Sequence, residues 1–442
     1  MRLPSLTSRL HPALLKRPSY WLWRRRLARY PLENPLPTDI GQYERMHRVV
    51  SHAYECTGGY RQLYDEAGVH PRDLRSLADL GSFPYVTKEL IRDNLEEFSL
   101  KAEQRIYITT GGSTGIPFGF YTTRAELVVE EAFIHDWWIR AGWCLGATTA
   151  VLRGAFVGSE AMPARFSAAE RTLSLSSYYI DPRRARDYLG LLGRHKVTDL
   201  QAYPSSLAML LDALAGQDII APVSLRRILL GSENIYDWLI EKARVVFPSV
   251  RFVGWYGQAE RAAFAWRLED GGYRVHPLYG ITELRGDRGQ ACRAGEEGEI
   301  VATALHAGVT PFVRYRTMDR AIQAGDRPDH WDSIIGRSHE VLVTGRGRLI
   351  SMTAINMHDN LFDPLLQFQF VQRTKGAVEF LVVPRSPLDS SAIARIHRGL
   401  IVKLGDDIEV TVREVTSIPR TPSGKLRFLD QRLAVARHEE VT

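Results

Sequence analysis

The chain has 442 residues, a length that suggests two or three domains. Its 45% hydrophobic and 24% charged residues are typical of a globular protein, and no apolar run is long enough to span a bilayer. The net charge is +6, but no long basic stripe lies beyond the N-terminus, so we expect no nucleic-acid partner. The three cysteines form no CxxC pair, which argues against a zinc knuckle and favours a reducing cytoplasm.

The first 30 residues, MRLPSLTSRLHPALLKRPSYWLWRRRLARY, are basic and aromatic, and they lack the apolar core of a signal peptide. We expect residues 1–50 to form a basic arm or helices packed on the body of the protein. The alternative interpretation is contact with an anionic membrane surface or a biosynthetic complex through Trp21, Trp23 and Arg24 to Arg26.

Short β-branched runs then alternate with helical patterns, which predicts an α/β fold with buried sheets. The predicted strands are RIYIT (105–109), TTAVLRG (148–154), RRILLGSE (226–233), VRFVGWYG (250–257) and GEIVATAL (298–305). The predicted helices are RAELVVEEAFIHDWWIRAG (124–142) and SSLAMLLDALAG (205–216), the second with a serine cap and a glycine stop.

Residues 337–442 predict a separate, small α+β domain. VEFLVVP (378–384) and IEVTVREV (408–415) are predicted strands, and the residues between them form a helical pattern. Its apolar face carries Ile393, Ile396, Leu400 and Leu404. GRSHE (336–340) precedes this domain as a predicted hinge, so a larger domain would span residues 51–336.

A Gly- and hydroxyl-rich loop, ITTGGSTGIPFGF (108–120), follows the first predicted strand. Glycines let backbone N–H groups approach phosphate oxygens, and the following helix N-terminus adds positive potential. Ile116 and Pro117 break the Walker A pattern, which excludes a P-loop NTPase. The alternative is an ordinary Gly-rich turn at a strand end.

Three later motifs carry groups suited to a nucleotide. WYGQAE offers an aromatic ring, Tyr256, for a purine, and a carboxylate, Glu260, for Mg²⁺. FVRYRTMDR places Asp319 after a strand-like run, where a carboxylate can accept hydrogen bonds from ribose hydroxyls. PRTPSGKLR places Lys425 in a Ser-Gly-Lys turn. Taken singly, each residue is typical of a solvated loop.

In this order, TTGGSTGIP, GSE, YGQAE, YRTMD, GR and PRTPSGK resemble the successive signatures of the adenylate-forming superfamily of acyl-CoA synthetases, adenylation domains and luciferases. The resemblance covers Tyr60 to Arg427. The short chain, with no lysine after Pro117, is most similar to the phenylacetate–CoA ligase branch, which includes capsule- and exopolysaccharide-associated relatives. It implies a large multi-sheet N-terminal domain and a mobile C-terminal lid that carries the catalytic lysine.

The resemblance implies an ATP-dependent, AMP-forming ligase that activates a carboxylic acid with Mg²⁺ and passes the acyl group to CoA. It assigns Gly231, Ser232 and Glu233 to adenine, with Tyr256 stacked on it and Gly257 as a further nucleotide-binding residue. Asp319 would bind ribose with Arg337 nearby, Glu260 would hold Mg²⁺, and Lys425 would bridge the substrate carboxylate and the α-phosphate. The residues assigned to the β- and γ-phosphates are Thr109, Thr110, Gly111, Gly112, Ser113, Thr114 and Gly115.

Three positions depart from the family pattern. Phe118 stands where many relatives carry lysine, Met318 replaces the usual glycine of YRTGD, and His339 stands where the hinge residue is usually aspartate. The hinge departure leaves alternatives open: transfer to a carrier protein, a sugar amine or a protein instead of CoA, or a non-catalytic nucleotide-binding relative. The resemblance also allows a homodimer.

Histidines show no metal-binding spacing. His135 is expected to be a packed core histidine rather than an acyl-pocket residue, and His276 is a candidate substrate-side group. The cluster of Phe133, Trp137 and Trp138 is expected to be helix core.

Overall fold

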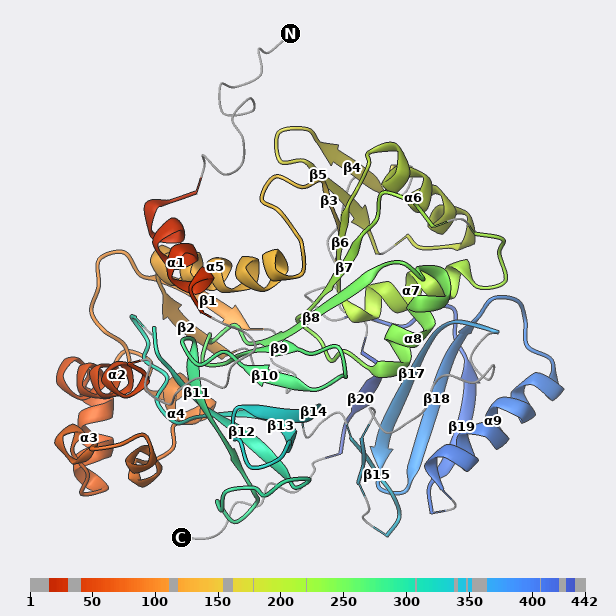
Figure 1. The fold of residues 1–442 in the computed structure, drawn as a ribbon. Coiled ribbons are helices and arrows are strands. Elements are labelled where there is room, and N and C mark those ends of the chain that lie inside the picture. The colour runs from red at the N-terminus through yellow and green to blue at the C-terminus, as the bar shows by residue number, and fades with distance from the viewer. Residues whose placement is uncertain are drawn as a thin grey trace. The chain divides into compact units, whose positions relative to one another are not determined.

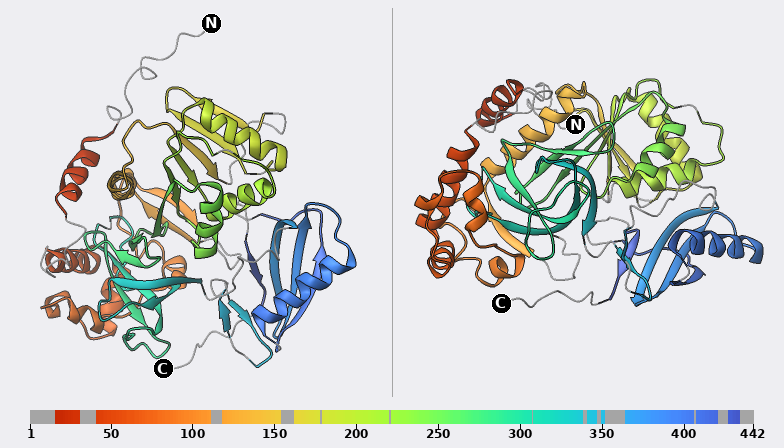
Figure 2. Two further views of the ribbon diagram at one scale, coloured as in Figure 1. Left: turned by 45° about the vertical axis from the view of Figure 1, so that its right-hand side comes forward. Right: turned by 60° about the horizontal axis from the view of Figure 1, so that its bottom comes forward.

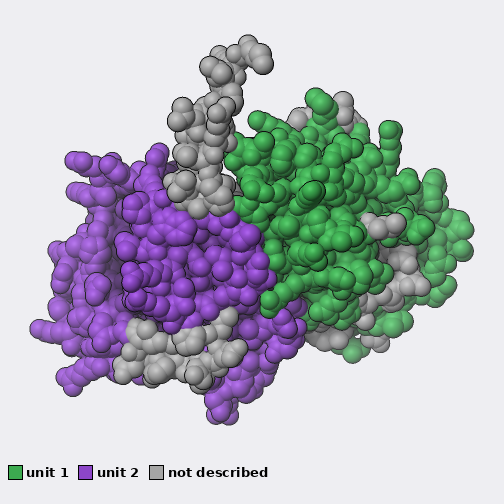
Figure 3. Space-filling view, turned by 45° about the horizontal axis from the view of Figure 1, so that its top comes forward, with its two compact units in different colours: residues 1–10, 146–253, 335–442 green, residues 11–145, 254–334 purple. Residues whose placement is uncertain are grey.

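The computed structural model describes residues 16–30, 41–110, 118–153, 162–177, 179–219, 221–306, 308–337, 341–346, 349–351, 364–405, 407–420 and 427–433. These residues fall into two compact units (Figure 3). Unit 1 combines Gly146–Val253 with Ile335–Thr442, and unit 2 combines His11–Leu145 with Gly254–Ile334. The three-domain division expected from the sequence stays a prediction, and its boundary at residue 336 lies near the end of a strand, His330–Arg337.

Unit 2 contains five α-helices among its described residues (Figure 1). They are α1 (Pro18–Ala28), α2 (Gln42–Cys56), α3 (Gly58–Glu66), α4 (Lys88–Asp93) and α5 (Arg124–Arg140). Helix α5 begins where Thr123 accepts a hydrogen bond from the backbone N–H of Glu126, the N-cap interaction that satisfies a free donor of the first turn. No helix in the described ranges is both long and apolar enough to cross a membrane.

The strands of unit 2 form a hairpin and a larger sheet. In the hairpin, β1 (Ile106–Thr110) pairs antiparallel with β2 (Phe118–Thr122). The larger sheet has the order β11-β12-β13-β14-β10-β9-β8. These strands are β8 (Arg251–Gly257), β9 (Phe264–Arg267), β10 (Tyr273–Val275), β11 (Gly280–Arg285), β12 (Glu297–Ala304), β13 (Tyr315–Gln323) and β14 (His330–Arg337). Alternating buried residues along β13 direct one face of this strand to the core.

A β-bulge interrupts the pairing of β12 with β13. Glu299 opposes Arg320 and Val301 opposes Arg316, so three residues of β13 face one residue of β12. Met318, at the centre of this bulge, has a φ of +64°, a left-handed conformation that favours glycine. The expectation that Asp319 follows a strand is wrong, because β13 continues through the bulge to Gln323.

Helix α1 packs on α5, which confirms that this N-terminal segment lies on the body of the protein. The Tyr20 hydroxyl hydrogen-bonds Nδ1 of buried His135 at 2.8 Å, and Arg24 forms an ion pair with buried Asp136. Trp21 keeps 45% of its surface exposed. Burial, together with the nearby charges of Lys16 and Arg24, lowers the pKa of His135 to about 3.

The first part of unit 1 is a mainly parallel sheet with the order β7-β6-β3-β5-β4. Its strands are β3 (Thr149–Arg153), β4 (Ala164–Ser167), β5 (Thr172–Ser176), β6 (Asp199–Ala202) and β7 (Arg227–Leu230). Strands β5, β3, β6 and β7 are parallel, and β4 pairs antiparallel with β5. The accompanying helices are α6 (Pro182–Arg194), α7 (Pro204–Leu214) and α8 (Asp237–Val246).

Every residue of α7 is buried. The serine cap predicted for this helix is wrong: Tyr203 is the N-cap residue and makes no side-chain cap hydrogen bond. Pro204 explains the earlier start, because its missing N–H and fixed φ suit the first position of a helix.

The second part of unit 1 is the predicted small α+β domain. Its four-stranded sheet has the order β19-β18-β17-β20, and α9 covers one face (Figure 2). Its strands are β17 (Leu365–Thr374), β18 (Ala377–Pro384), β19 (Glu409–Glu414) and β20 (Leu429–Gln431), and α9 spans Ser390–Leu404. A separate antiparallel pair consists of β15 (Val341–Val343) and β16 (Leu349–Ser351). Ile396, Leu400 and Leu404 are buried on α9, whereas Ile393 is only partly buried. The predicted fold class, α/β with a large multi-sheet part and a small C-terminal part, is confirmed.

We expect Met318→Gly to raise the free energy of unfolding by about 1 kcal/mol, because glycine removes the strain of a left-handed residue. Chemical denaturation of the full chain measures this difference. Met318→Ala is the matched control, since it shortens the side chain but keeps the Cβ atom and therefore the strain. Equal stabilisation by alanine and glycine would contradict the assignment of strain to the backbone.

Acidification from pH 7 to pH 5 should lower the free energy of unfolding through His135. The folded pKa of about 3 lies below the ordinary value near 6.5, so the unfolded chain takes up a proton that the folded chain refuses. Denaturation midpoints across this range should fall less steeply for His135→Gln than for the wild type. The exposed His397→Gln is the control, and identical slopes for wild type and His135→Gln would count against the prediction.

Candidate active site

Tyr256 and Asp319 meet in unit 2. Tyr256 lies near the end of β8, and its hydroxyl donates a hydrogen bond to Oδ2 of Asp319 at 2.7 Å. Gln258 Nε2 contacts the same carboxylate oxygen at 3.4 Å and also hydrogen-bonds the Tyr256 hydroxyl. The backbone N–H of Asp319 donates to Oγ1 of Thr317 at 3.1 Å, so the bulge on β13 fixes the direction of the carboxylate.

The protonation state of Tyr256 follows from its surroundings. Burial and the negative charge of Asp319 raise the pKa of Tyr256 well above its ordinary value. The phenol therefore stays protonated and remains a donor. Its ring also packs edge-on against Trp331, with centroids 5.7 Å apart. The predicted adenine and ribose contacts, Tyr256 and Asp319, thus form one hydrogen-bonded pair, while their roles toward a nucleotide stay predictions.

Glu260 is buried a few residues farther along the chain. Its Oε1 accepts a hydrogen bond from the Tyr315 hydroxyl at 2.7 Å and lies 3.6 Å from Nζ of Lys88. The next residue, Arg261, has its Nε 2.7 Å from Oε2 of Glu130 on α5. The Tyr315 hydroxyl therefore holds the Glu260 carboxylate, and the ion pair of Arg261 with Glu130 anchors the next residue of the chain to α5.

A single carboxylate fits the Mg²⁺ role predicted for Glu260. Within the part of the chain that the structure describes, no three His, Cys, Asp or Glu side chains gather as a metal site. Mg²⁺ in nucleotide enzymes is commonly bound by one or two carboxylates together with substrate phosphates and water. The Mg²⁺ role of Glu260 stays a prediction.

Lys88 is a neighbour of Glu260 that the sequence did not single out. It is the first residue of α4, where Thr87 accepts the N-cap hydrogen bond. Its local motif, Thr-Lys-Glu-Leu, is typical of any capped helix. Only the packing of α4 against β2 and β13 reveals its position.

The predicted adenine residues Gly231, Ser232 and Glu233 follow β7 in unit 1. Glu233 accepts hydrogen bonds from the backbone N–H of Ser205 at 2.8 Å and from its hydroxyl at 3.0 Å. Ser205 lies in the first turn of α7, where a carboxylate is favoured by free N–H groups and by the helix dipole. The structure thus fixes this segment at the carboxyl end of β7.

Other predicted site residues are not described in full. Thr109 and Thr110 lie in β1, and Arg337 lies in β14. The predicted residues outside the described ranges are Gly111, Gly112, Ser113, Thr114, Gly115, His339 and Lys425. The phosphate-binding, hinge and catalytic-lysine assignments therefore stay predictions.

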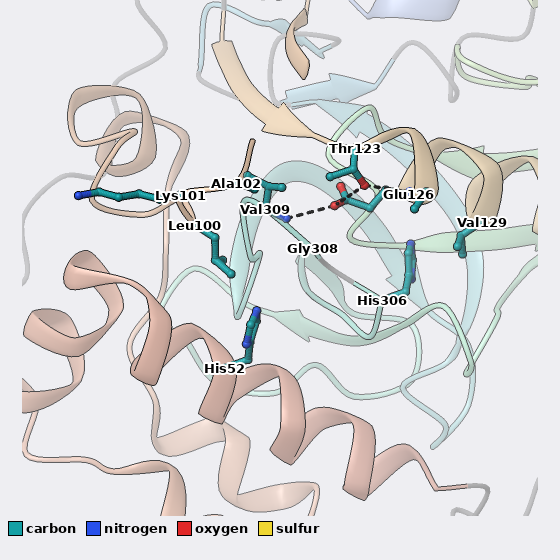
Figure 4. Close-up of a pocket in the computed structure, with 11 residues that line it drawn as sticks. His52, Leu100, Lys101, Ala102, Thr123, Glu126, Val129, His306, Gly308 and Val309 are labelled. Atoms are coloured by element: carbon teal, nitrogen blue, oxygen red, sulfur yellow. Dashed lines mark hydrogen bonds between the residues drawn. The ribbon is translucent and has the colours of Figure 1, made fainter. Parts of the chain in front are cut away.

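A cavity of about 330 Å³ lies in unit 2 (Figure 4). Its lining includes His52, Lys101, Glu126 and His306, none of which the sequence assigns to ATP. Oε1 of Glu126 accepts a hydrogen bond from the backbone N–H of Val309 at 3.1 Å.

The remaining predicted core residues are confirmed as packing groups. His135, Phe133 and Trp138 are buried, and the indole N–H of Trp137 donates to the Gly254 carbonyl at 2.8 Å. His276 is fully buried, and burial lowers its pKa well below the ordinary value. Its proposed contact with substrate is not tested.

Comparisons with known proteins identify the family of the chain. The family described as AMP-binding enzyme matches residues 87–305, and the CapK C-terminal domain matches residues 342–431. A phenylacetate-coenzyme A ligase from Escherichia coli (strain K12) is 43% identical over 416 residues, covering 88% of this chain and 94% of the relative. Protein CapK from Staphylococcus aureus is 22% identical, covering 80% of each chain.

The fold is also found in a solved structure. A 2-hydroxyisobutyryl-CoA ligase in its postadenylation state superposes with a TM-score of 0.70 at 17% identity, covering 91% of this chain and 94% of that one. The family expected from the motifs is thereby confirmed. The chain belongs to the phenylacetate–CoA ligase-like family of adenylate-forming enzymes, which includes CapK-type members, and it is an ATP-dependent, AMP-forming ligase.

Proposed function

We propose that the enzyme activates a carboxylic acid with ATP and then forms a thioester with CoA. In the first step a carboxylate oxygen attacks the α-phosphorus, the bond to the β-phosphate breaks, and pyrophosphate leaves. In the second step the thiol of CoA adds to the acyl carbon, loses its proton, and displaces AMP. The observation that carries the proposal is the hydrogen bond between Tyr256 and the buried Asp319, with the buried Glu260 four residues after Tyr256, in a chain 43% identical to a CoA ligase.

Asp319 would bind the ribose in this reaction. Its carboxylate can accept hydrogen bonds from both ribose hydroxyls, and charge-assisted hydrogen bonds of this kind are strong. The protonated Tyr256 donates to the same carboxylate and keeps it oriented before the nucleotide arrives. Pre-orientation reduces the entropy lost on binding.

Glu260 would hold Mg²⁺, which neutralises charge on the departing pyrophosphate. Lys425 would lie between two anions, the substrate carboxylate and the α-phosphate, and offset their repulsion as they approach. Charge concentrates on the phosphoryl oxygens in the transition state, so a lysine there acts mainly on the rate.

Transfer to an acceptor other than CoA is the second candidate. The match of residues 342–431 to the CapK C-terminal domain favours it, as does the histidine at the expected hinge position, His339. Incubation of the purified enzyme with ATP, an active acid and either CoA or an amine acceptor, followed by mass spectrometry of the products, separates the two candidates.

Pyrophosphate exchange with a panel of carboxylic acids tests the first step, and Lys425→Ala tests its mechanism. We expect the variant to slow single-turnover adenylation by about 100-fold or more, as when one transition-state donor is removed. Its affinity for ATP should change less than about threefold, because the lysine acts in the transition state. The exposed Lys375→Ala is the control.

Two results would overturn these assignments. Wild-type enzyme that neither binds ATP nor exchanges pyrophosphate with any acid would remove the proposed activity. An active wild type whose Lys425→Ala variant adenylates at the same rate would remove only the role of the lysine.

Asp319→Ala should weaken the binding of AMP and ATP alike, by about 10- to 100-fold, since one charge-assisted contact to the ribose is lost. Titration calorimetry measures both affinities. Asp326→Ala, an exposed aspartate just beyond β13, is the matched control. An Asp319→Ala variant that binds AMP as tightly as the wild type would show that this carboxylate does not bind the ribose.

A further inference from the structure

The carboxyl ends of four parallel strands form one edge of the sheet in unit 1. Strands β5, β3, β6 and β7 are neighbours in parallel register, with Arg153 opposite Ser176 and Ala202 opposite Leu230. Open α/β sheets bind their ligands outside this edge. Gly231, which starts the segment assigned to adenine, follows β7 here. Arg153, the last residue of β3, lies two strands away at the same edge.

Arg153 is a partly buried cation that no carboxylate of the described residues pairs with. Its Nε is closed to solvent and has no hydrogen-bond acceptor, and no carboxylate in the described ranges forms an ion pair with its guanidinium. Its neighbour is the ring of Tyr203, whose centroid lies 5.4 Å from Cζ. Burial lowers the pKa of Arg153, the direction expected for a cation that has lost water without gaining a counter-ion.

Two other arginines that are at least partly buried show the usual arrangement. Arg227, on β7, has its Nε 2.5 Å from Oδ1 of Asp199, and Arg261 has its Nε 2.7 Å from Oε2 of Glu130. Removing a charge from water is costly unless a partner replaces the solvent. Arg153 therefore bears a cost in the ligand-free protein that an arriving anion would offset.

The groups around Arg153 add positive charge to this edge. The hydroxyl of Ser177 donates to the Arg153 carbonyl at 3.1 Å, and the Arg420 guanidinium donates to the same hydroxyl at 2.9 Å. Glu233, at the end of β7, is engaged by Ser205. The ring of Tyr203 supports one guanidinium by a cation–π contact, while the N–H groups at the guanidinium edge can bind a carboxylate in a bidentate manner.

We infer that Arg153 binds a second acidic group of the acyl substrate, so that the enzyme activates acids that carry two carboxylates. The inference rests on the proposed function and specifies its substrate class. The carboxylate that becomes adenylated is assigned by sequence to Lys425, and the ATP phosphates are assigned to residues 109–115. Adenine, assigned to the segment after β7, is uncharged. Among the ligands of the first step, the anion left for Arg153 is therefore one that the substrate brings at its other end, and the phosphates of CoA arrive only in the second step.

Matched pairs of acids test this inference in pyrophosphate exchange without CoA. The pairs are glutarate with pentanoate and 3-carboxyphenylacetate with 3-methylphenylacetate, which differ in one carboxylate. Wild-type enzyme should prefer the diacid in at least one pair by about tenfold or more in kcat/KM. A site built to hydrogen-bond a polar group of the substrate discriminates against an analogue that lacks this group. Arg153→Met should abolish this preference and leave the monoacid within about threefold of wild type, and Arg153→Lys should restore part of it.

Thermal unfolding without ligand gives a second readout. Arg153→Met should melt at or above the wild-type Tm, because it removes a partly buried charge that no described carboxylate pairs with. Arg227→Met, which breaks the ion pair with Asp199 on a neighbouring strand, should melt below it. A lower Tm for Arg153→Met would show that the arginine also stabilises the fold, and the preference of the wild type between the paired acids would then decide on the inference.

The other possible results of the exchange assay also decide between the inference and the proposed function. Exchange with monoacids and no preference for diacids overturns the inference while the proposed function stands, and so does a defect of Arg153→Met that appears only when CoA is added. If Arg153→Met does not fold, the wild-type preference between the paired acids still decides. Wild-type enzyme inactive toward every acid tested, with no ATP binding, instead removes the proposed function itself.

Discussion

A charge that folding removes from water needs a partner, and the interior of unit 2 depends on this constraint. Helix α5 carries Asp136 and Glu130 into the protein, where Arg24 of α1 and Arg261 after β8 neutralise them. Breaking such a pair leaves one charge buried and unpaired, which is far more costly than losing a surface pair. The ion pairs therefore fix which elements can pack on α5, as well as stabilising the packing.

The same constraint organises the candidate active site. Asp319 is satisfied by the phenol of Tyr256, and Glu260 by the phenol of Tyr315. Asp319 thus receives a neutral phenol donor, whereas Glu260 has both a phenol and, 3.6 Å away, the ammonium group of Lys88. Arg153, in unit 1, is the exception, because no described carboxylate of the protein pairs with it.

Periodicity and motif order predicted much of the fold, because strands and helices are encoded locally. The predicted runs correspond to β1, β3, β7, β8 and β12 within a residue or two, apart from the residues after β7. The path of β13 beyond Asp319 was missed, because a bulge depends on the register of two strands. Lys88 and Arg153 were also missed. Lys88 is distinguished by the carboxylate of Glu260, which is far away in the sequence, and Arg153 by the lack of a described carboxylate beside it. Motifs identified Tyr256 and Asp319 singly, whereas their hydrogen bond joins residues 63 positions apart.

Helix α7, buried along its whole length, has a consequence for how this protein can diverge from its relatives. A helix at a surface has one face on which substitutions accumulate independently. Helix α7 has no such face, and close packing makes each change of volume felt by its neighbours. Evolutionary change in this part of unit 1 therefore proceeds through compensated substitutions, in which the helix and the strands beside it change together.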